Sequence, residues 1–529
     1  MNFGKARMRL GKTGVAIAVA ALVAGCGNNY RSTVTTTTPS GPAAQTTAYA
    51  VVVSAPSSAT TSCPTTKAGI VTIIDYSGDT WMAQACTTGP DPVSFTLDTT
   101  GGSGYTNNSD STISNFPVSK SLQQKQVYPT TFPSTAQPMN IYATSSGLWV
   151  ADLDKNVADA FSGSPQTLQR TVSLAPTPVL VMGSTSRSYG ISQGEGILTG
   201  VECNISPSTV AANGEADVIE SSYTVSAKIP LGKCPVYAVE SSDASRLFVL
   251  NRGSDTITVI NMTDGALNSC TPFVDHNTGR TVTCHSTLPL SQAALNTTNA
   301  PANCNYASDP TCSLAADGGL AATAGPVYAE YNTAKSLLVV ANYDGGTISV
   351  IDVSLDRWGN DSAAFGTTYT IPVGTNPASV TVLLDGSRAY TANQADDGTG
   401  NGTVTVVALS SNTVEKTLPV TGHPRNVASI QNSEYGKVYV ASPDSNLLTV
   451  INAGGAEADT LDTTVPVVGN IVDVRVNTQD GTAVNSNNLS RTPGYGQPCN
   501  LPLSEYNPAS SSDSVALANC KVQDVKNLK

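Results

Sequence analysis

Apolar and polar residues alternate along most of this chain, and the alternation restarts after each of seven prolines. The phrase Pro-Val-Tyr-Ala stands at 235–238 and again at 326–329, and five related phrases keep its pattern. The opening prolines are Pro92, Pro138, Pro178, Pro235, Pro326, Pro377 and Pro424. Their spacings of 46, 40, 57, 91, 51 and 47 residues define a unit of about 45 residues, the period expected of a β-propeller blade.

Each unit contains four short segments with the pattern of a strand. In the unit that opens at Pro377 they are 377–382, 389–393, 403–407 and 413–419. Alternating Val, Ile, Thr and Tyr is typical of half-buried antiparallel strands, and the mature chain has no long amphipathic helical stretch. The pattern predicts an all-β propeller of four-stranded antiparallel blades, because neighbouring blades cover one another and a ring leaves no open end.

The two ends of the repeat region carry incomplete units. Residues 471–476 read as a first strand without a second, whereas 49–53 and 71–75 read as second and third strands without a first. Pairing them would make one composite blade and close the ring. Eight units result, and seven remain an alternative because the unit that opens at Pro92 is the least regular.

Two second strands carry a resemblance to a known family. Residues 438–442 (Val-Tyr-Val-Ala-Ser) and 389–393 (Ala-Tyr-Thr-Ala-Asn), each followed by a Thr-Val-Val type strand, resemble the YVTN family of β-propeller repeats. The resemblance covers residues 48–481, is strong from Pro235 onward and is weaker between Pro92 and Pro235. The family often forms seven-bladed rings, is widespread in bacterial surface and secreted proteins, and has lactone-hydrolysing relatives. It therefore implies a fold and a location more firmly than an activity.

Composition narrows the classes of partner. Charged residues make up 12% of the 529 residues, and the net charge is −12. Such a chain lacks the basic stripe that a phosphate backbone requires, so we expect no nucleic-acid binding. The sequence does not define an oligomeric state.

The first residues have the organisation of an export signal. Residues 1–25 combine a basic start with the apolar run 13–23, and Val-Ala-Gly precedes Cys26; this resembles a bacterial lipoprotein lipobox. The resemblance implies that Cys26 is lipidated and becomes the mature N-terminus, attached to the membrane by its acyl chains. Gly27 would favour the outer membrane in a diderm, and 26–47 is predicted to be a flexible linker. An ordinary secretory signal with a chance cysteine is the alternative.

Ten cysteines remain after Cys26, an even number that favours disulfides in an oxidising compartment. Proximity in the sequence suggests the pairs Cys63–Cys86, Cys203–Cys234, Cys270–Cys284, Cys304–Cys312 and Cys499–Cys520. A zinc site is disfavoured, because the chain has no Cys-x-x-Cys and only three histidines.

Few residues are candidates for a catalytic or metal-binding site. His423 and Arg425 flank Pro424 at the start of a blade, which places them near the mouth of the predicted channel. Asp396 and Asp397 lie in an oxygen-rich turn, where calcium is the alternative to an ordinary solvated turn. No cofactor is predicted otherwise.

Two segments depart from the repeat. A cysteine-rich insertion spans 265–325 and a tail spans 482–529; either carries function or only covers an edge. The leading hypothesis is a lipid-anchored propeller of the cell envelope that binds or scaffolds a protein or glycan without catalysis. The alternative is a lactonase-like hydrolase with its site in the central channel, so the enzyme question stays open.

Overall fold

The computed structural model describes eighteen parts of the chain. They are residues 48–56, 68–108, 110, 112–119, 121–122, 130–131, 138–144, 147–153, 155–163, 166–183, 187–195, 203, 207, 210–275, 279–290, 323–395, 398–430 and 436–477. Within them, no helix is long and apolar enough to cross a membrane.

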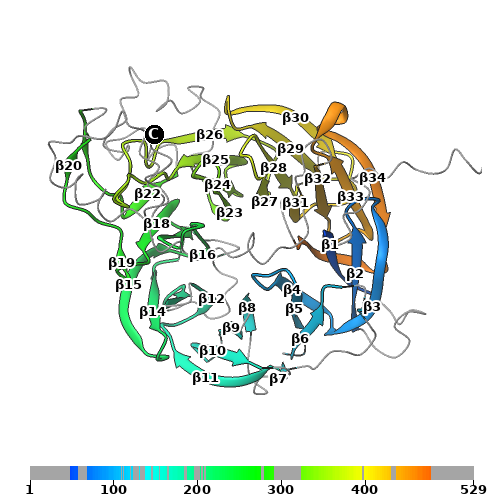
Figure 1. The fold of residues 1–529 in the computed structure, drawn as a ribbon, viewed down its shortest axis with the longest axis horizontal. Coiled ribbons are helices and arrows are strands. Elements are labelled where there is room, and N and C mark those ends of the chain that lie inside the picture. Colours follow the sequence, from blue (N-terminus) through cyan, green and yellow to red (C-terminus); the bar gives the residue numbers. More distant parts are fainter. Residues whose placement is uncertain are drawn as a thin grey trace, which may run out of the picture.

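Eight antiparallel blades surround a common axis, as predicted for an all-β propeller (Figure 1). From the innermost strand outwards, blade 1 is β35 (Asn470–Val476), β1 (Tyr49–Ala55), β2 (Ala68–Asp75) and β3 (Thr80–Pro90); blade 2 is β4 (Pro92–Leu97), β5 (Ser103–Asn108), β6 (Thr112–Pro117) and β7 (Thr130–Thr131); blade 3 is β8 (Pro138–Ala143), β9 (Gly147–Asp152), β10 (Val157–Ser162) and β11 (Thr167–Ser173); blade 4 is β12 (Pro178–Gly183), β13 (Arg187–Ser192), β14 (Asn213–Glu220) and β15 (Val225–Lys233).

The remaining four blades follow in chain order around the ring. Blade 5 is β16 (Pro235–Glu240), β17 (Arg246–Asn251), β18 (Thr256–Asn261) and β19 (Ala266–Leu267); blade 6 is β23 (Pro326–Asn332), β24 (Leu337–Asn342), β25 (Thr347–Asp352) and β26 (Thr368–Pro372); blade 7 is β27 (Pro377–Val382), β28 (Arg388–Asn393), β29 (Thr403–Ala408) and β30 (Thr413–Pro419); blade 8 is β31 (Asn426–Ile430), β32 (Lys437–Ala441), β33 (Leu447–Asn452) and β34 (Thr460–Pro466).

The ring closes as the sequence predicts, because strands from the two ends of the repeat region share blade 1. In the antiparallel pair of β35 and β1, Arg475 lies opposite Val51. Next to it, the backbone N–H of Tyr49 donates to Asn477 Oδ1 at 2.7 Å, and the Asn477 N–H donates to the Tyr49 carbonyl at 3.1 Å. The composite blade makes the count eight rather than seven.

The hydrophobic core lies between the blades. Val52 and Ile74 of blade 1 pack with Leu448 and Val450 of blade 8, and all four are fully buried. Each blade is apolar on both faces, so it is covered only when it has two neighbours. The alternating strands of the sequence therefore require the closed ring.

A repeated asparagine fixes the second hairpin of several blades. Asn342, the last residue of β24, donates to Thr347 Oγ1 at 3.0 Å and to Ser349 Oγ at 2.9 Å. Asn251 and Asn393 make the same pair of bonds in blades 5 and 7. These amides are buried, and a buried polar group must be paired. The bonds explain why the second strands end in Asn and the third strands begin with Thr-x-Thr or Thr-x-Ser.

Strand direction defines two faces of the disc. First and third strands run one way and second and fourth strands run back, because neighbouring strands are antiparallel. We call the side where first strands begin the top face, and the side where they end the bottom face. Turns between first and second strands, and between third and fourth strands, lie on the bottom face. Since β1 is a second strand and β35 a first strand, the chain enters blade 1 and leaves it on the bottom face.

The described part of the insertion projects from the outer edge of blade 5. Two short strands, β19 and β22 (Thr287–Pro289), both pair with β18. Between them the chain forms a hairpin of β20 (Phe273–Val274) and β21 (Thr281–Val282), which Figure 1 shows outside the ring. The disulfide Cys270–Cys284 joins the two sides of its base, with 5.3 Å between the Cα atoms.

Two of the suggested disulfides are present, Cys203–Cys234 and Cys270–Cys284. Cys86 is also disulfide-bonded. The other cysteines lie outside the described residues, and so do Asp396, Asp397, the linker, most of the insertion after residue 290 and the tail; these are Cys26, Cys63, Cys304, Cys312, Cys499 and Cys520.

Candidate functional site

Four polar or aromatic side chains from innermost strands meet near the axis of the ring. We call Tyr237 (β16), Tyr328 (β23), Asp473 and Arg475 (both β35) the axial cluster. The two tyrosine rings are stacked, with centroids 4.7 Å apart and 28° between their planes. Arg475 Nη1 lies 3.5 Å from the Tyr328 hydroxyl, although blades 7 and 8 separate β23 from β35 around the ring.

The register of the innermost strands brings these residues to one height. Tyr237 lies opposite Leu250 and Tyr328 opposite Ala341, in each case the residue before the last of the second strand. Asn426 of β31 occupies the equivalent place opposite Ala441. The third residues of these three proline phrases thus lie at a common level near the axis.

An ion pair orients the guanidinium of the axial cluster. Arg475 Nε and Nη2 lie 3.2 and 3.1 Å from Asp473 Oδ2. Asp473 Oδ1 accepts from the side-chain amide of Asn426 and from the backbone N–H of Val474 at 2.7 Å. The Asp473 side chain is 11% exposed, whereas the Arg475 side chain is 35% exposed. The acceptor is therefore buried and fixed, and the donor remains accessible.

Burial favours the protonated hydroxyl of Tyr237 in the axial cluster. Burial raises the pKa of Tyr237 well above its ordinary value, and the neighbouring Tyr328 raises it further. Both residues are half-buried. The cluster thus offers hydroxyls, a guanidinium, a carboxylate and two aromatic rings, and its carboxylate is engaged by Asn426, Val474 and Arg475.

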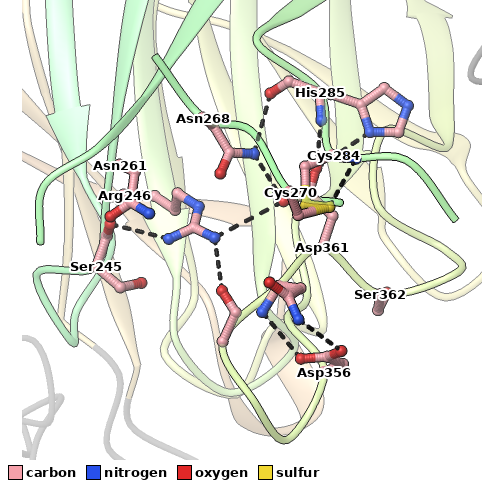
Figure 2. Close-up of polar contacts among 12 residues, drawn as sticks. Ser245, Arg246, Asn261, Asn268, Cys270, Cys284, His285, Asp356, Asp361 and Ser362 are labelled. Carbon is pink, nitrogen blue, oxygen red and sulfur yellow. Dashed lines mark hydrogen bonds and ion pairs between the residues drawn. A yellow bond between two sulfur atoms is a disulfide. The ribbon is translucent and has the colours of Figure 1, made fainter. Parts of the chain in front are cut away.

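A second cluster joins the insertion to blade 6, and Figure 2 shows it. Asp361, in the segment between β25 and β26, is fully buried. Its Oδ1 accepts from Asn268 Nδ2 at 2.8 Å, and its Oδ2 accepts from the backbone N–H of His285 at 2.6 Å. Arg246 Nη2 lies 3.8 Å from Asp361 Oδ1 and donates to the Gly359 carbonyl at 2.6 Å.

We call Arg246, Asn268, His285 and Asp361 the blade-five cluster, and the ring of His285 completes it. Its Nδ1 lies 3.2 Å from Asp361 Oδ2, and its face stacks on Phe365 with 5.7 Å between centroids. Because a carboxylate accepts, Nδ1 carries a proton. Nε2 is buried and has no hydrogen-bond partner among the described residues. The Asp–His geometry resembles the orienting half of a catalytic triad. Within the described residues, no nucleophilic hydroxyl or thiol is hydrogen-bonded to the His285 ring.

In other blades, the start of the second strand also contacts the turn between the third and fourth strands of the next blade. In blade 7 the second strand β28 begins with Arg388 and has Tyr390 two positions later. Both side chains bind the carboxylate of Asp459, which lies in the turn between the third and fourth strands of blade 8. We call this arrangement an interblade latch.

Blade 8 repeats the latch against blade 1. Lys437, the first residue of β32, binds Asp79, and the Tyr439 hydroxyl donates to Asp79 Oδ1 at 3.2 Å. Lys437 is 1% exposed and Asp79 5% exposed. Asp79 and Asp459 both adopt a left-handed backbone, with φ of 51° and 60°, which aspartate tolerates in turns.

Blade 5 contains a modified latch. Arg246 is the first residue of β17, but Phe248 stands where blades 7 and 8 have tyrosine. Asn268 and His285 from the insertion supply the donors that the tyrosine would provide. Burial lowers the pKa of the Arg246 guanidinium, and Asp361 opposes that shift. We therefore interpret the blade-five cluster as a structural contact.

The residues that the sequence singled out for the channel mouth lie on the top face, before β31. The His423 N–H donates to Asp444 Oδ1 at 2.8 Å, and His423 Nδ1 lies 2.6 Å from Asp444 Oδ2. Arg425 is exposed, and its backbone N–H donates to the Ala441 carbonyl at 2.9 Å. These contacts keep His423 with blade 8 rather than with the axial cluster.

Metal binding remains a prediction. Asp396 and Asp397 lie outside the described residues, and the described part of the chain has no group of three or more His, Cys, Asp or Glu side chains arranged to hold a metal ion.

Sequence reasoning missed the axial cluster and the blade-five cluster. A signal for the first was present, because Tyr237 and Tyr328 hold the third place of their proline phrases. The second gave no signal, since His285 and Asp361 are 76 residues apart.

Comparison with solved structures finds similar architectures. AztD from Citrobacter koseri matches with a TM-score of 0.51 and 11% identity, over 81% of this chain and 98% of that chain. The dihydro-heme d1 dehydrogenase NirN, in complex with DHE, matches with a TM-score of 0.52 and 11% identity, over 85% and 78%. A putative 6-phosphogluconolactonase from Bacteroides fragilis matches at 0.44 and 11%, over 82% and 99%. The shared feature is the propeller fold.

At these identities the likeness carries no activity or ligand from those proteins to this chain. No family model matches the sequence, and no curated protein matches it.

Proposed function

We propose that this protein is a lipid-anchored propeller of the cell envelope, of the YVTN type, that binds a glycan at its axial cluster without catalysis. The observation that carries the proposal is the accessible guanidinium of Arg475, held by buried Asp473 beside the stacked pair of Tyr237 and Tyr328. The anchor rests on the lipobox at Cys26.

The chemistry of the cluster suits a ligand rich in hydroxyls. Each sugar hydroxyl both donates and accepts, and the cluster offers donors and acceptors side by side. Tyrosine rings add apolar area for the C–H face of a sugar while their hydroxyls stay polar. Because Arg475 is paired with Asp473, the site is close to neutral, which favours a neutral sugar over a strongly charged one.

The binding test is a titration of the purified protein with oligosaccharides released from the envelope of its own host. Arg475→Met removes the accessible guanidinium, and we expect a loss of about 1.5–3 kcal/mol, or about 10- to 100-fold in affinity. Tyr328→Phe removes one hydroxyl and keeps the ring, so its loss is smaller. His423→Ala, on the top face, serves as the matched control and leaves affinity unchanged.

Two results would contradict the proposal. Unchanged affinity in both axial variants, with the unfolding midpoint preserved, would place the site elsewhere. Cleaved sugar or opened lactone in the incubation would favour the hydrolase alternative. The anchor is tested separately by mass spectrometry of the N-terminus and by Cys26→Ala, which should release the protein from membranes.

A further inference from the structure

Exposed apolar side chains are distributed unevenly between the two faces of the disc. The described residues include eight large apolar side chains that are at least 39% exposed. Seven of them lie in bottom-face turns or at the second residue of a fourth strand, where that strand leaves the bottom face. The seven, which we call the bottom ring, are Trp81, Leu168, Tyr223, Trp358, Leu384, Val414 and Leu461.

None of these side chains lies in a described top-face loop; the eighth, Val274, is on the projecting hairpin. Single exposed apolar residues are ordinary on a protein surface, so the feature to be explained is that all seven lie on one face of the disc. The bottom ring is spread over blades 1, 3, 4, 6, 7 and 8. A flat surface as wide as the disc can touch all of these blades at once, whereas a compact protein partner would contact only a few.

The bottom ring also has the composition of a membrane interface. It contains Trp81, Trp358 and Tyr223, and such amphipathic rings concentrate at the headgroup level of bilayers. The Arg357 guanidinium lies over the Trp358 ring, 3.9 Å from its centroid, a cation–π contact that fixes this exposed ring on the bottom face.

The position of the N-terminus agrees with this surface. The described chain begins at Ala48 and enters β1 on the bottom face. From Cys26 to Ala48 there are 22 residues, which reach at most about 75 Å when fully extended. A lipid on Cys26 would therefore place the bottom face within reach of the membrane.

Charge narrows the kind of lipid. The exposed ionisable residues of the bottom-face turns include Asp243, Asp264, Asp385 and Glu457, against Lys335. Anionic headgroups would be repelled by this excess of carboxylates. We propose that the bottom ring rests on a bilayer surface of zwitterionic phospholipid, an inference that rests on the proposed lipid anchor and assigns the orientation of the anchored disc.

The test uses the full anchored chain in phosphatidylcholine vesicles whose acyl chains are brominated and quench tryptophan. The protein has three tryptophans, and two of them belong to the bottom ring. We expect emission to fall relative to vesicles without bromine, and the double variant Trp81→Ser/Trp358→Ser to lose most of this quenching. Both side chains are exposed, so the variant should fold. The third tryptophan, Trp149, is half-buried and its ring lies 5.8 Å from that of Tyr223 in the bottom ring, so it accounts for the quenching that remains. The control His423→Ala, on the top face, keeps the full quenching.

Vesicle flotation separates this proposal from the anchor. Protein that floats without quenching would overturn the bottom-ring proposal and leave the anchor intact. Protein that proves unlipidated is mixed with preformed vesicles: quenching on mixing supports the bottom ring, and its absence overturns it. Shielding of both tryptophans from acrylamide before any lipid is added would overturn the proposal, because the bottom ring would already be covered. Quenching confined to phosphatidylglycerol vesicles would overturn the assignment to zwitterionic lipid.

Discussion

The latch between blades 5 and 6 and the latch between blades 7 and 8 fasten equivalent elements with different groups. Between blades 7 and 8, Arg388 and Tyr390 share Asp459. Between blades 5 and 6, the aspartate is fully buried, and asparagine and histidine from the insertion replace the tyrosine. The insertion is thus part of the packing of the ring, and the pairing of its His285 with Asp361 of blade 6 has a structural explanation.

The largest difference in stability between the two latches is expected when their aspartates are replaced. Asp361→Ala leaves Arg246, whose side chain is 4% exposed, without its carboxylate, and it removes the acceptor of Asn268 and His285. Unpairing a buried charge costs about 3–5 kcal/mol. Asp459→Ala unpairs Arg388, which is 18% exposed, and should cost about 1–3 kcal/mol. Urea unfolding midpoints measure both; equal losses would show that burial by the insertion adds nothing.

Activity on a lactone or ester panel is the control for this first prediction. If Asp361→Ala abolished a hydrolytic activity while its unfolding midpoint stayed near that of the unchanged protein, the structural interpretation of the blade-five cluster would be wrong.

Repeat spacing predicted the blades better than it predicted the latches. Prolines at a regular interval report strand starts directly, and the half-units at both ends predicted the closed ring. A latch depends on which turn lies beside which strand across a blade boundary. Lys437 and Asp79 are 358 residues apart, and they meet only because the ring closes with eight blades. The contact between Arg475 and Tyr328 could not be predicted from the repeat for the same reason, because it also depends on how the closed ring places distant strands.

Tyr390 and Tyr189, each the third residue of a second strand, differ in the charge of their hydrogen-bond acceptor. The Tyr390 hydroxyl donates to a carboxylate, whereas that of Tyr189 in blade 4 donates to the Met262 carbonyl at 3.1 Å. Burial raises the pKa of Tyr189 to about 12, so its hydroxyl keeps its proton. Tyr390→Phe should cost about 1.5–3 kcal/mol and Tyr189→Phe about 0.5–1.5 kcal/mol.

Calorimetric unfolding of the two tyrosine variants provides the measurement. The reverse substitution Phe248→Tyr in blade 5 is the matched control: Phe248 is fully buried, and an added hydroxyl there should destabilise rather than restore a latch. A stabilising Phe248→Tyr would show that Asp361 still has room for a tyrosine.

The smallest effect is expected where an ion pair is exposed and lies within one blade. His423 and Asp444 of blade 8 have side chains 39% and 46% exposed. Burial raises the pKa of Asp444, but hydrogen bonds from His423 outweigh it, and the pKa is lowered from 3.8. A carboxylate with a lowered folded pKa stabilises the protein above its unfolded pKa, and this contribution is lost as pH falls from about 4 through the folded value.

Solvent screening keeps the contribution of this pair below about 1 kcal/mol. Asp444→Asn should therefore lower stability slightly at pH 6 and less at pH 2, because the stabilisation is lost as the wild-type carboxyl gains its proton. Unfolding at both pH values, with Asp385→Asn as an exposed control, measures the difference. A loss of stability at pH 6 as large as that of Asp361→Ala would mean that this exposed ion pair contributes as much as a buried latch. An equal loss of stability at pH 2 would mean that Asp444 stabilises the protein by the geometry of its hydrogen bonds with His423 rather than by its charge.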